Sequence, residues 1–281
     1  MTQRRSPRRP FLLGAASLLA LPALRSAQSV DAVLAPGPST QRWNDLRAAM
    51  FDGRPTERVA DGAALSLGVP HRAVDPAAVP VSIGVSAGFA SRLRAVWLVV
   101  EANPAPLALY VEPGPAGGLR DLSTVVRLEA RGPVHVVAET TAGRLLEAAS
   151  FVEAARGVSA PRDIDLASAR STIGRMRLGL PEGPPAPDRA VPVRLTIAHP
   201  NTSGRQVDRA DGRALPASFL RQITVRYRRA DLLRIEADTA VAEDPTFGFS
   251  LAGEPGGELR VEAEDSDGRR FRAAWTLGAA G

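Results

Sequence analysis

The sequence predicts an all-β protein of two immunoglobulin-like β-sandwich domains, preceded by a short N-terminal helix. One observation is the composition: 25 Gly and 24 Pro among 281 residues, with 5% aromatic residues, favour many short elements separated by turns. The other is an alternation of apolar and polar residues with a period of two along most of the chain. A chain of this length, 44% hydrophobic, is large enough for about two domains, each with its own core.

The first residues are typical of an export signal. Arg8 and Arg9 precede an apolar run from Phe11 to Leu24, which is shorter than the roughly 20 residues of a membrane-spanning helix. Paired arginines before such a run resemble the twin-arginine signal, which carries folded proteins across the bacterial inner membrane. We therefore expect residues 1–29 to be a removable leader and the mature protein to be periplasmic. Cleavage remains open among three positions that have small residues nearby: Ala27, Ser29 and Ala35.

The charge balance gives no indication of a polyanionic partner. All 35 basic residues are arginine, five of them precede residue 28, and the other 30 match the 30 acidic residues. The mature chain is therefore predicted to be near neutral, without a nucleic-acid partner. The chain has no cysteine, which excludes disulfides, thiolate catalysis and thiolate metal sites and leaves core burial as the source of stability.

The first domain is predicted to span residues 38–160 and to open with the short helix. Ser39 or Thr40 is expected to cap this helix, and Asp52-Gly53 to end it. Its apolar face has residues at helical spacing: Trp43, Leu46, Ala49 and Met50. Six segments with a period of two are then predicted to be strands: Val79 to Val85, Leu93 to Glu101, Leu107 to Glu112, Leu122 to Leu128, Val134 to Thr140 and Leu145 to Phe151. Thr141-Ala142-Gly143 predicts a tight hairpin between the last two.

A weaker pattern separates this domain from the next. Asp163 to Leu178 is predicted to form one more helix, and the proline-rich run from Gly179 to Pro187 a stiff linker. We therefore assign residues 161–190 to helix and linker and residues 191–281 to the second domain.

The second domain has the clearest alternation in the chain. Four segments carry it: Ile223 to Tyr227, Leu233 to Ala237, Leu259 to Ala263 and Phe271 to Leu277. Asp265-Ser266-Asp267-Gly268 predicts the turn between the last two. Val193 to Ile197 and Phe247 to Leu251 add further strands. One polar and one apolar face per strand is what two stacked sheets require, which favours an immunoglobulin-like sandwich.

Sequence motifs of common enzyme classes are absent. The chain has no G-x-S-x-G elbow, Walker loop, H-E-x-x-H pair or dinucleotide fingerprint. His71, His135 and His199 have no carboxylate at metal-ligand spacing, so they are expected to be loop or strand-end residues, and no metal or cofactor is predicted. Glu243-Asp244 and the turn at Asp265 imitate a calcium loop but are expected to be solvated turns. We predict a binding protein rather than an enzyme.

Several motifs, in order, resemble the fused SoxYZ-like sulfur carriers associated with quinoprotein dehydrogenases. Motifs similar to the SoxY half are Trp43-Asn44-Asp45-Leu46-Arg47, Met50-Phe51-Asp52-Gly53-Arg54-Pro55, Val69-Pro70-His71-Arg72-Ala73-Val74-Asp75-Pro76, Val79-Pro80-Val81 and Asn103-Pro104-Ala105-Pro106. Motifs similar to the SoxZ half are Ile197-Ala198-His199-Pro200, Ser203-Gly204, Leu215-Pro216-Ala217-Ser218-Phe219, Glu243-Asp244-Pro245 and Phe247-Gly248-Phe249. The resemblance covers nearly all of the mature chain.

The resemblance implies two immunoglobulin-like sandwiches in which a cysteine on a Gly-rich segment carries sulfur between periplasmic enzymes. In the fused carriers the segment reads Gly-Cys-Ser-Ala-Pro, and the corresponding stretch here is Gly157-Val158-Ser159-Ala160-Pro161. Val158 has no nucleophile and no other cysteine replaces it, so covalent sulfur carriage is predicted to be lost. Ser159 is expected to form loop hydrogen bonds, since no base is predicted beside it. The five residues are predicted to be a partner-docking surface.

Two functions of different classes follow. The first is an accessory protein that docks onto a periplasmic oxidoreductase, either a quinoprotein dehydrogenase or a Sox-type enzyme. The alternative is a periplasmic small-molecule binding module with its ligand in an interdomain crevice near His71 and His199. An enzyme whose catalytic residues form no recognisable motif ranks last.

Overall fold

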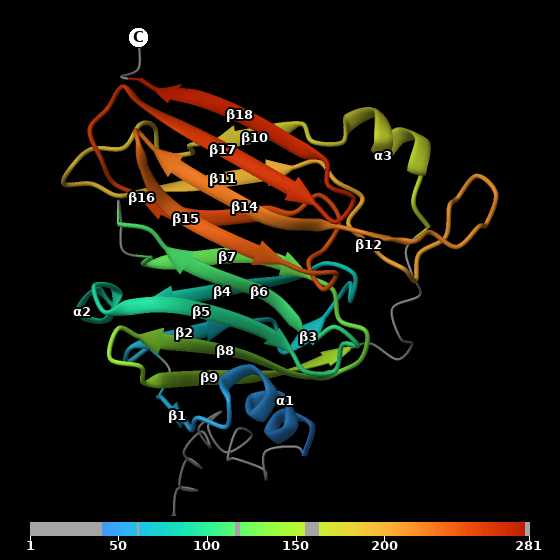
Figure 1. Ribbon diagram of the computed structural model, residues 1–281, viewed down its shortest axis with the longest axis horizontal. Coiled ribbons are helices and arrows are strands. Elements are labelled where there is room, and N and C mark those ends of the chain that lie inside the picture. The colour runs from blue at the N-terminus through green and yellow to red at the C-terminus, as the bar shows by residue number, and fades with distance from the viewer. Residues whose placement is uncertain (1–40, 61, 116–118, 155–162, 279–281) are drawn as a thin grey trace, which may run out of the picture. The chain divides into compact units, whose positions relative to one another are not determined.

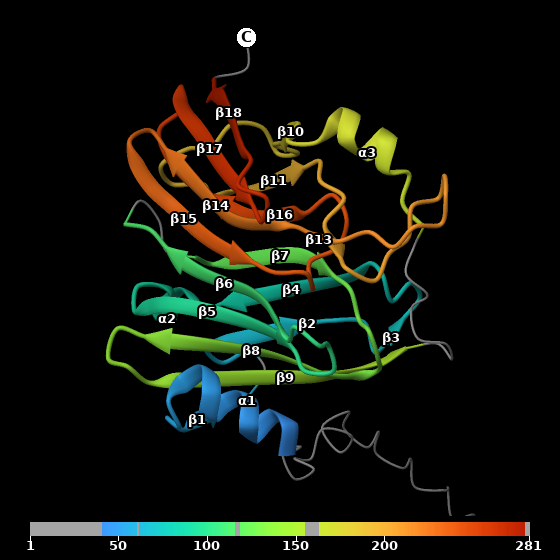
Figure 2. The same ribbon diagram turned by 45° about the vertical axis from the view of Figure 1, so that its right-hand side comes forward.

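The computed structural model describes residues 41–60, 62–115, 119–154 and 163–278. In this part of the chain the fold consists of two large β-sheets packed face to face, with one helix on an outer face near the N-terminal end (Figures 1 and 2). The β-rich architecture and the short N-terminal helix agree with the prediction. No helix in these ranges is long and apolar enough to cross a membrane.

The N-terminal half, residues 41–154, holds two short helices and nine strands of the described chain. They follow in the order α1 (Gln41–Phe51), β1 (Thr56–Arg58), β2 (Leu65–Gly68), β3 (Arg72–Ala73), β4 (Val79–Val85), α2 (Ala87–Ala90), β5 (Leu93–Val100), β6 (Leu107–Pro113), β7 (Asp121–Val126), β8 (Gly132–Thr140) and β9 (Leu145–Ala154). All six strands predicted here are present, and Gly143, at φ +80°, forms the predicted hairpin between β8 and β9.

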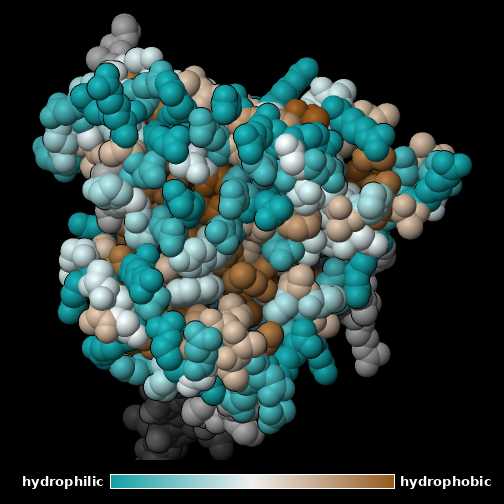
Figure 3. Space-filling view, in the orientation of Figure 1, coloured by the Kyte–Doolittle hydropathy of each residue, from teal (hydrophilic) through white to brown (hydrophobic). Residues whose placement is uncertain are grey.

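The C-terminal half, residues 163–278, holds one helix and nine strands within the described ranges. They are α3 (Leu166–Thr172), β10 (Met176–Gly179), β11 (Val191–Ile197), β12 (Thr202–Ser203), β13 (Ala217–Ser218), β14 (Leu220–Tyr227), β15 (Ala230–Ala237), β16 (Thr246–Leu251), β17 (Gly257–Asp265) and β18 (Arg270–Leu277). The space-filling view shows mostly hydrophilic residues over the part of the molecule that holds β14, β17 and β18 (Figure 3). Cross-strand ion pairs such as Arg226 with Glu262, at 3.1 Å, occupy these outward positions.

Both sheets run through the junction between the two halves. The larger sheet has the order β1-β9-β8-β5-β6-β15-β14-β17-β18, with β3 paired to β9, and the smaller one the order β10-β11-β16-β7-β4-β2. At the junction Ile235 of β15 lies opposite Val111 of β6, and Phe249 of β16 lies opposite Leu122 of β7. The two halves therefore share hydrogen-bonded sheets.

The main apolar core spans both halves as a result of this pairing. The inward positions of β4 are all buried, and so are those of β11 and β17: Val79, Val81, Ile83, Val85, Val191, Val193, Leu195, Ile197, Leu259, Val261 and Ala263. One continuous buried cluster holds residues of both halves, so the core extends across the junction. Burial of apolar side chains is the dominant stabilising contribution in this chain, which has no cysteine and therefore no disulfide.

Helix α1 confirms the predicted helix but corrects its buried face. Trp43 and Phe51 are buried, whereas Ala49, which the helical spacing placed on the apolar face, is exposed. The helix ends where Asp52 and Gly53 adopt φ +52° and +71°, as predicted. The predicted caps, Ser39 and Thr40, lie outside the described residues.

The predicted helix from Asp163 to Leu178 is wrong in its second half. Asp165 caps α3 by accepting a hydrogen bond from the Ser168 amide at 2.9 Å, but the helix ends at Thr172. Gly174 then takes φ +79°, which turns the chain back. The next residues pair with β11 as strand β10, because tertiary pairing outweighs the weak helical preference of the sequence.

Candidate functional site

The predicted docking residues Gly157, Val158, Ser159, Ala160 and Pro161 lie outside the described residues. The residues on both sides of segment 155–162 are described. We call these residues, together with those that pair with them, the arm base. It consists of the loop from His71 to Asp75, the end of β9, and residues 207–209 with Asp163 and Ile164.

The N-terminal half fixes one end of this segment. Glu153 and Ala154, the last residues of β9, pair in parallel with Arg72 and Ala73 of β3, and the Glu153 amide donates to the His71 carbonyl at 2.8 Å. Ala73 is buried, so this short pair is tied to the core rather than lying loosely on the surface.

The C-terminal half fixes the other end. Ile164 is 3% exposed, its amide donates to the Val207 carbonyl at 3.1 Å, and its carbonyl accepts from the Arg209 amide at 2.9 Å. The Arg209 guanidinium also donates to the Asp163 carbonyl at 3.1 Å. The described residues on either side of segment 155–162 are therefore hydrogen-bonded, one set in each half.

The arm base carries the exposed large hydrophobic side chains of the described ranges. These are Val74, 97% exposed, and Phe151, 37% exposed. Val74 directly follows the β3 residue that pairs with Ala154, and Phe151 lies three residues before Ala154. Exposed hydrophobic side chains near one end of a strand are compatible with a contact surface. Val74 lies within a SoxY-like sequence motif, but no pattern in the sequence predicts its exposure.

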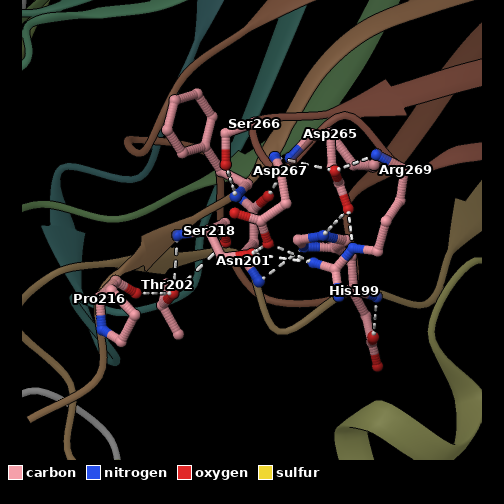
Figure 4. Close-up of polar contacts among 12 residues, drawn as sticks. His199, Asn201, Thr202, Pro216, Ser218, Asp265, Ser266, Asp267 and Arg269 are labelled. Carbon is pink, nitrogen blue, oxygen red and sulfur yellow. Dashed lines mark hydrogen bonds and ion pairs between the residues drawn. The ribbon is translucent and has the colours of Figure 1, made fainter.

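A buried polar network surrounds His199 in the C-terminal half (Figure 4). The Asn201 amide donates to His199 Nδ1 at 3.0 Å, so the ring proton is on Nε2, which faces Asp265 Oδ2 at 3.4 Å. Burial lowers the pKa of His199 and outweighs the hydrogen bond to Asp265, so the ring is neutral. Arg269 donates to the same Asp265 oxygen at 2.6 Å.

A second buried histidine lies beneath helix α1. His135 Nε2 is 2.9 Å from Glu101 Oε2, and His135 Nδ1 is 3.1 Å from Glu147 Oε1; we call these three residues the carboxylate clamp. All three are at most 5% exposed. Hydrogen bonds to Glu101 and Glu147 raise the pKa of His135 although its burial acts in the opposite direction.

These networks leave no histidine nitrogen for general-base catalysis at either buried site, because both ring nitrogens of His135 and of His199 have partners. His71 is exposed at the arm base. Within the described residues no group of three or more His, Asp or Glu side chains could hold a metal ion. Among the described residues His199 is 1% exposed, so it does not line an open crevice of the kind predicted beside His71.

A shallow hollow of about 700 Å³ lies on the smaller sheet, over the junction of the halves. Its lining is mixed: the polar residues Ser82, Ser123, Thr124, Arg194, Thr196 and Thr246 are joined by Gly68, Val69, Pro70, Pro80, Val81 and Val125. Neither His71 nor His199 is among them, so this hollow is not the one predicted for the small-molecule alternative.

Two family matches decide the identity of the halves. Residues 47–158 match the family described as sulfur oxidation protein SoxY, and residues 181–276 match the family described as sulphur oxidation protein SoxZ. The chain is a SoxY domain fused to a SoxZ domain. These are immunoglobulin-like domains of the sulfur-oxidation carrier type. The predicted fold class is therefore confirmed, and so is the resemblance to SoxY and SoxZ. The arm base thus combines residues of the SoxY half with residues of the SoxZ half.

Comparison with individual proteins adds little beyond these families. The sulfur carrier protein SoxY from Chlorobium limicola f thiosulfatophilum is 22% identical over 40% of this chain and 91% of its own, with a TM-score of 0.34. A transglutaminase of red sea bream is 11% identical over 87% of this chain and 34% of its own, with a TM-score of 0.24. No curated protein matches the chain.

Proposed function

We propose that this chain is a periplasmic accessory protein of the SoxYZ type that docks onto an oxidoreductase but does not carry sulfur covalently. The observation that carries the proposal is the combination of a SoxY and a SoxZ domain with a complete absence of cysteine. A persulfide or thiosulfonate needs a thiolate, and Val158 stands where the resemblance places the carrier cysteine. Recognition of a partner is the function that these domains retain.

Export to the periplasm is supported by the twin-arginine pattern at Arg8 and Arg9. That compartment holds the oxidoreductases with which the resembling carriers work. A quinoprotein dehydrogenase and a Sox-type enzyme are the two partner classes that the resemblance suggests.

The arm base is the surface that supports docking. Val158 is four residues from Ala154, so its Cα lies at most about 14 Å from that anchor even in a fully extended chain. A partner that admits Val158 into a pocket would approach the end of β9, and burial of the exposed apolar side chains Val74 and Phe151 against it would favour docking.

Restoring the thiol tests both parts of the proposal. Val158→Cys is treated with a sulfur donor and a Sox-type loading enzyme, and bound sulfur is read by intact mass. The matched control is Ala142→Cys, an exposed hairpin thiol at the opposite end of β9. We expect loading of the first variant only, and loading at least about tenfold slower when Val74→Asp is added, because a buried unpaired carboxylate would oppose docking.

Failure has two distinguishable forms. A folded Val158→Cys protein that stays unloaded would contradict the retained docking function. Loading that is unaffected by Val74→Asp would leave docking intact and remove Val74 from the docking surface.

A further inference from the structure

The carboxylate clamp holds an imidazole between two acidic side chains at the centre of a helix-sheet contact. Glu101 follows β5, His135 is in β8 and Glu147 is in β9, so three neighbouring segments of the larger sheet meet at the ring. The indole of Trp43 from helix α1 stacks on one face of the His135 ring, with the ring centroids 3.7 Å apart and the planes at 10°.

Two carboxylate partners define the charge of the ring. A neutral imidazole has one N–H donor and one lone pair, and the lone pair would face a carboxylate oxygen at about hydrogen-bond distance. Only the imidazolium donates at both nitrogens, to Glu101 at 2.9 Å and to Glu147 at 3.1 Å. A cation stacked on the Trp43 indole also gains from the electron-rich face of that ring.

Other charged groups around the clamp come from each packed element. From α1, Arg42 donates to the Glu101 carbonyl, and Arg47 donates to the Thr56 hydroxyl at 3.2 Å. From β1, Thr56 donates to Glu147 Oε2 at 2.6 Å, and Arg58 contributes a positive charge near Glu147. Along β8 on the same face, Glu139 pairs with Arg54 at 2.7 Å. The Glu147 carboxylate therefore has Thr56 and Arg58 near it besides His135, and Glu139 is paired with Arg54.

Helix α1 depends on this region for its attachment. Its buried side chains Trp43 and Phe51 pack on Val99, Val137 and Leu145 in a cluster separate from the main core. Trp43 is the member that contacts the clamp.

We propose that the carboxylate clamp is a pH-dependent latch: protonated His135 holds helix α1 on the larger sheet through Trp43, and loss of the proton loosens the helix.

The direction of the pH effect follows from the titrating groups. Because the pKa of His135 is raised above its ordinary value of 6.5, its contribution is complete below pH 6.5 and is lost as the pH rises through the pKa of the folded protein. Burial opposes ionisation of Glu147, but its hydrogen bonds with His135 and Thr56 lower its pKa below 4.5. The contribution of Glu147 is therefore complete above pH 4.5 and is lost as the pH falls through its folded pKa. The latch is strongest between about pH 4.5 and 6.5.

Hydrogen exchange of the intact chain tests the latch. Exchange of the α1 amides, Gln41–Phe51, is followed by mass spectrometry at pH 6 and pH 9 and corrected for the intrinsic rate. We expect α1 protection to fall by about tenfold at the higher pH, the effect of losing one hydrogen bond to a charged group, while β17 keeps its protection. NMR titration of the His135 ring gives its protonation directly.

Two variants complete the experiment. His135→Gln removes the titrating group, and we expect its α1 protection to be the same at both pH values. His71→Gln, at an exposed histidine outside the cluster, should keep the pH dependence of the original protein. The latch is refuted if α1 protection is independent of pH in the original chain, or if His135 is neutral at pH 6.

Discussion

At the scale of single residues, buried polar side chains around His199 form hydrogen bonds that stabilise the fold. Asn201 is fully buried: its side-chain oxygen accepts from the Leu220 amide at 3.0 Å and its nitrogen donates to the Val241 carbonyl. The backbone carbonyl of Asn201 accepts from Arg127, a buried arginine of the SoxY half. Because a buried backbone group without a partner is costly, these side chains stabilise the loops around His199.

Replacing Asn201 measures this effect. Asn201→Ala leaves the Leu220 amide and the Val241 carbonyl without their side-chain partners, and we expect a loss of about 2 to 6 kcal/mol in the free energy of unfolding. Urea denaturation measures it. Gln222→Ala, at an exposed position of β14, should change the free energy by less than about 0.5 kcal/mol and serves as the control. Equal effects would mean that the network contributes nothing to stability.

At the scale of elements, glycines with positive φ fix where helices and strands end. Gly174 separates α3 from β10 at φ +79°, and a Cβ there would lie 2.0 Å from Phe271 Cδ1. Gly212 has a similar φ of +70° but nothing within 4 Å of such a Cβ. A substitution at Gly212 therefore measures backbone strain alone, whereas a substitution at Gly174 measures strain together with overpacking.

We expect Gly212→Ala to cost about 1 to 2 kcal/mol from backbone strain alone. Gly174→Ala should cost about 1 to 3 kcal/mol more, since Phe271 must move. Thermal unfolding of both variants measures the difference, and equal shifts in Tm would show that Phe271 yields without cost.

Among the elements, the long strands can be predicted from the sequence and the short ones cannot. Strands such as β4 and β17 alternate strictly, so periodicity alone located them. Strands β1, β2, β3 and β10 were missed because they are two to four residues long and owe their conformation to pairing partners far away in the chain. The hairpin at Gly143 was predicted, and its register puts Ala149 opposite His135 and Glu147 opposite Val137. Glu147 therefore lay within reach of prediction as a neighbour of His135, whereas Glu101 and Trp43 reach the ring only through tertiary packing.

At the scale of the whole molecule, the SoxY and SoxZ halves are joined by more than their linker. Strands β6 and β15 pair in the larger sheet, β7 and β16 pair in the smaller one, and Arg127 donates across the junction to the Asn201 and Thr239 carbonyls. The arm base also takes one anchor from each half. The two halves can be predicted from the sequence but the register between them cannot, because pairing across the junction leaves no pattern in either half alone.

Cutting the connection tests this continuity. A protease site is inserted into segment 155–162, which joins the two halves in the chain. After cleavage, the two fragments should co-elute in size-exclusion chromatography and unfold in one thermal transition, because β6 pairs with β15 and β7 with β16. Separate elution or two transitions would contradict shared sheets as the main link between the halves.

The central claim is that this SoxY–SoxZ fusion recognises partners without carrying covalent cargo. The most direct measurement is the intact mass of the unaltered protein purified from its native cells during growth on reduced sulfur. We predict the mass of the mature polypeptide alone, whichever of the proposed sites the leader is cleaved at. A sulfur-containing adduct, at Ser159 or at any other residue, would contradict the claim.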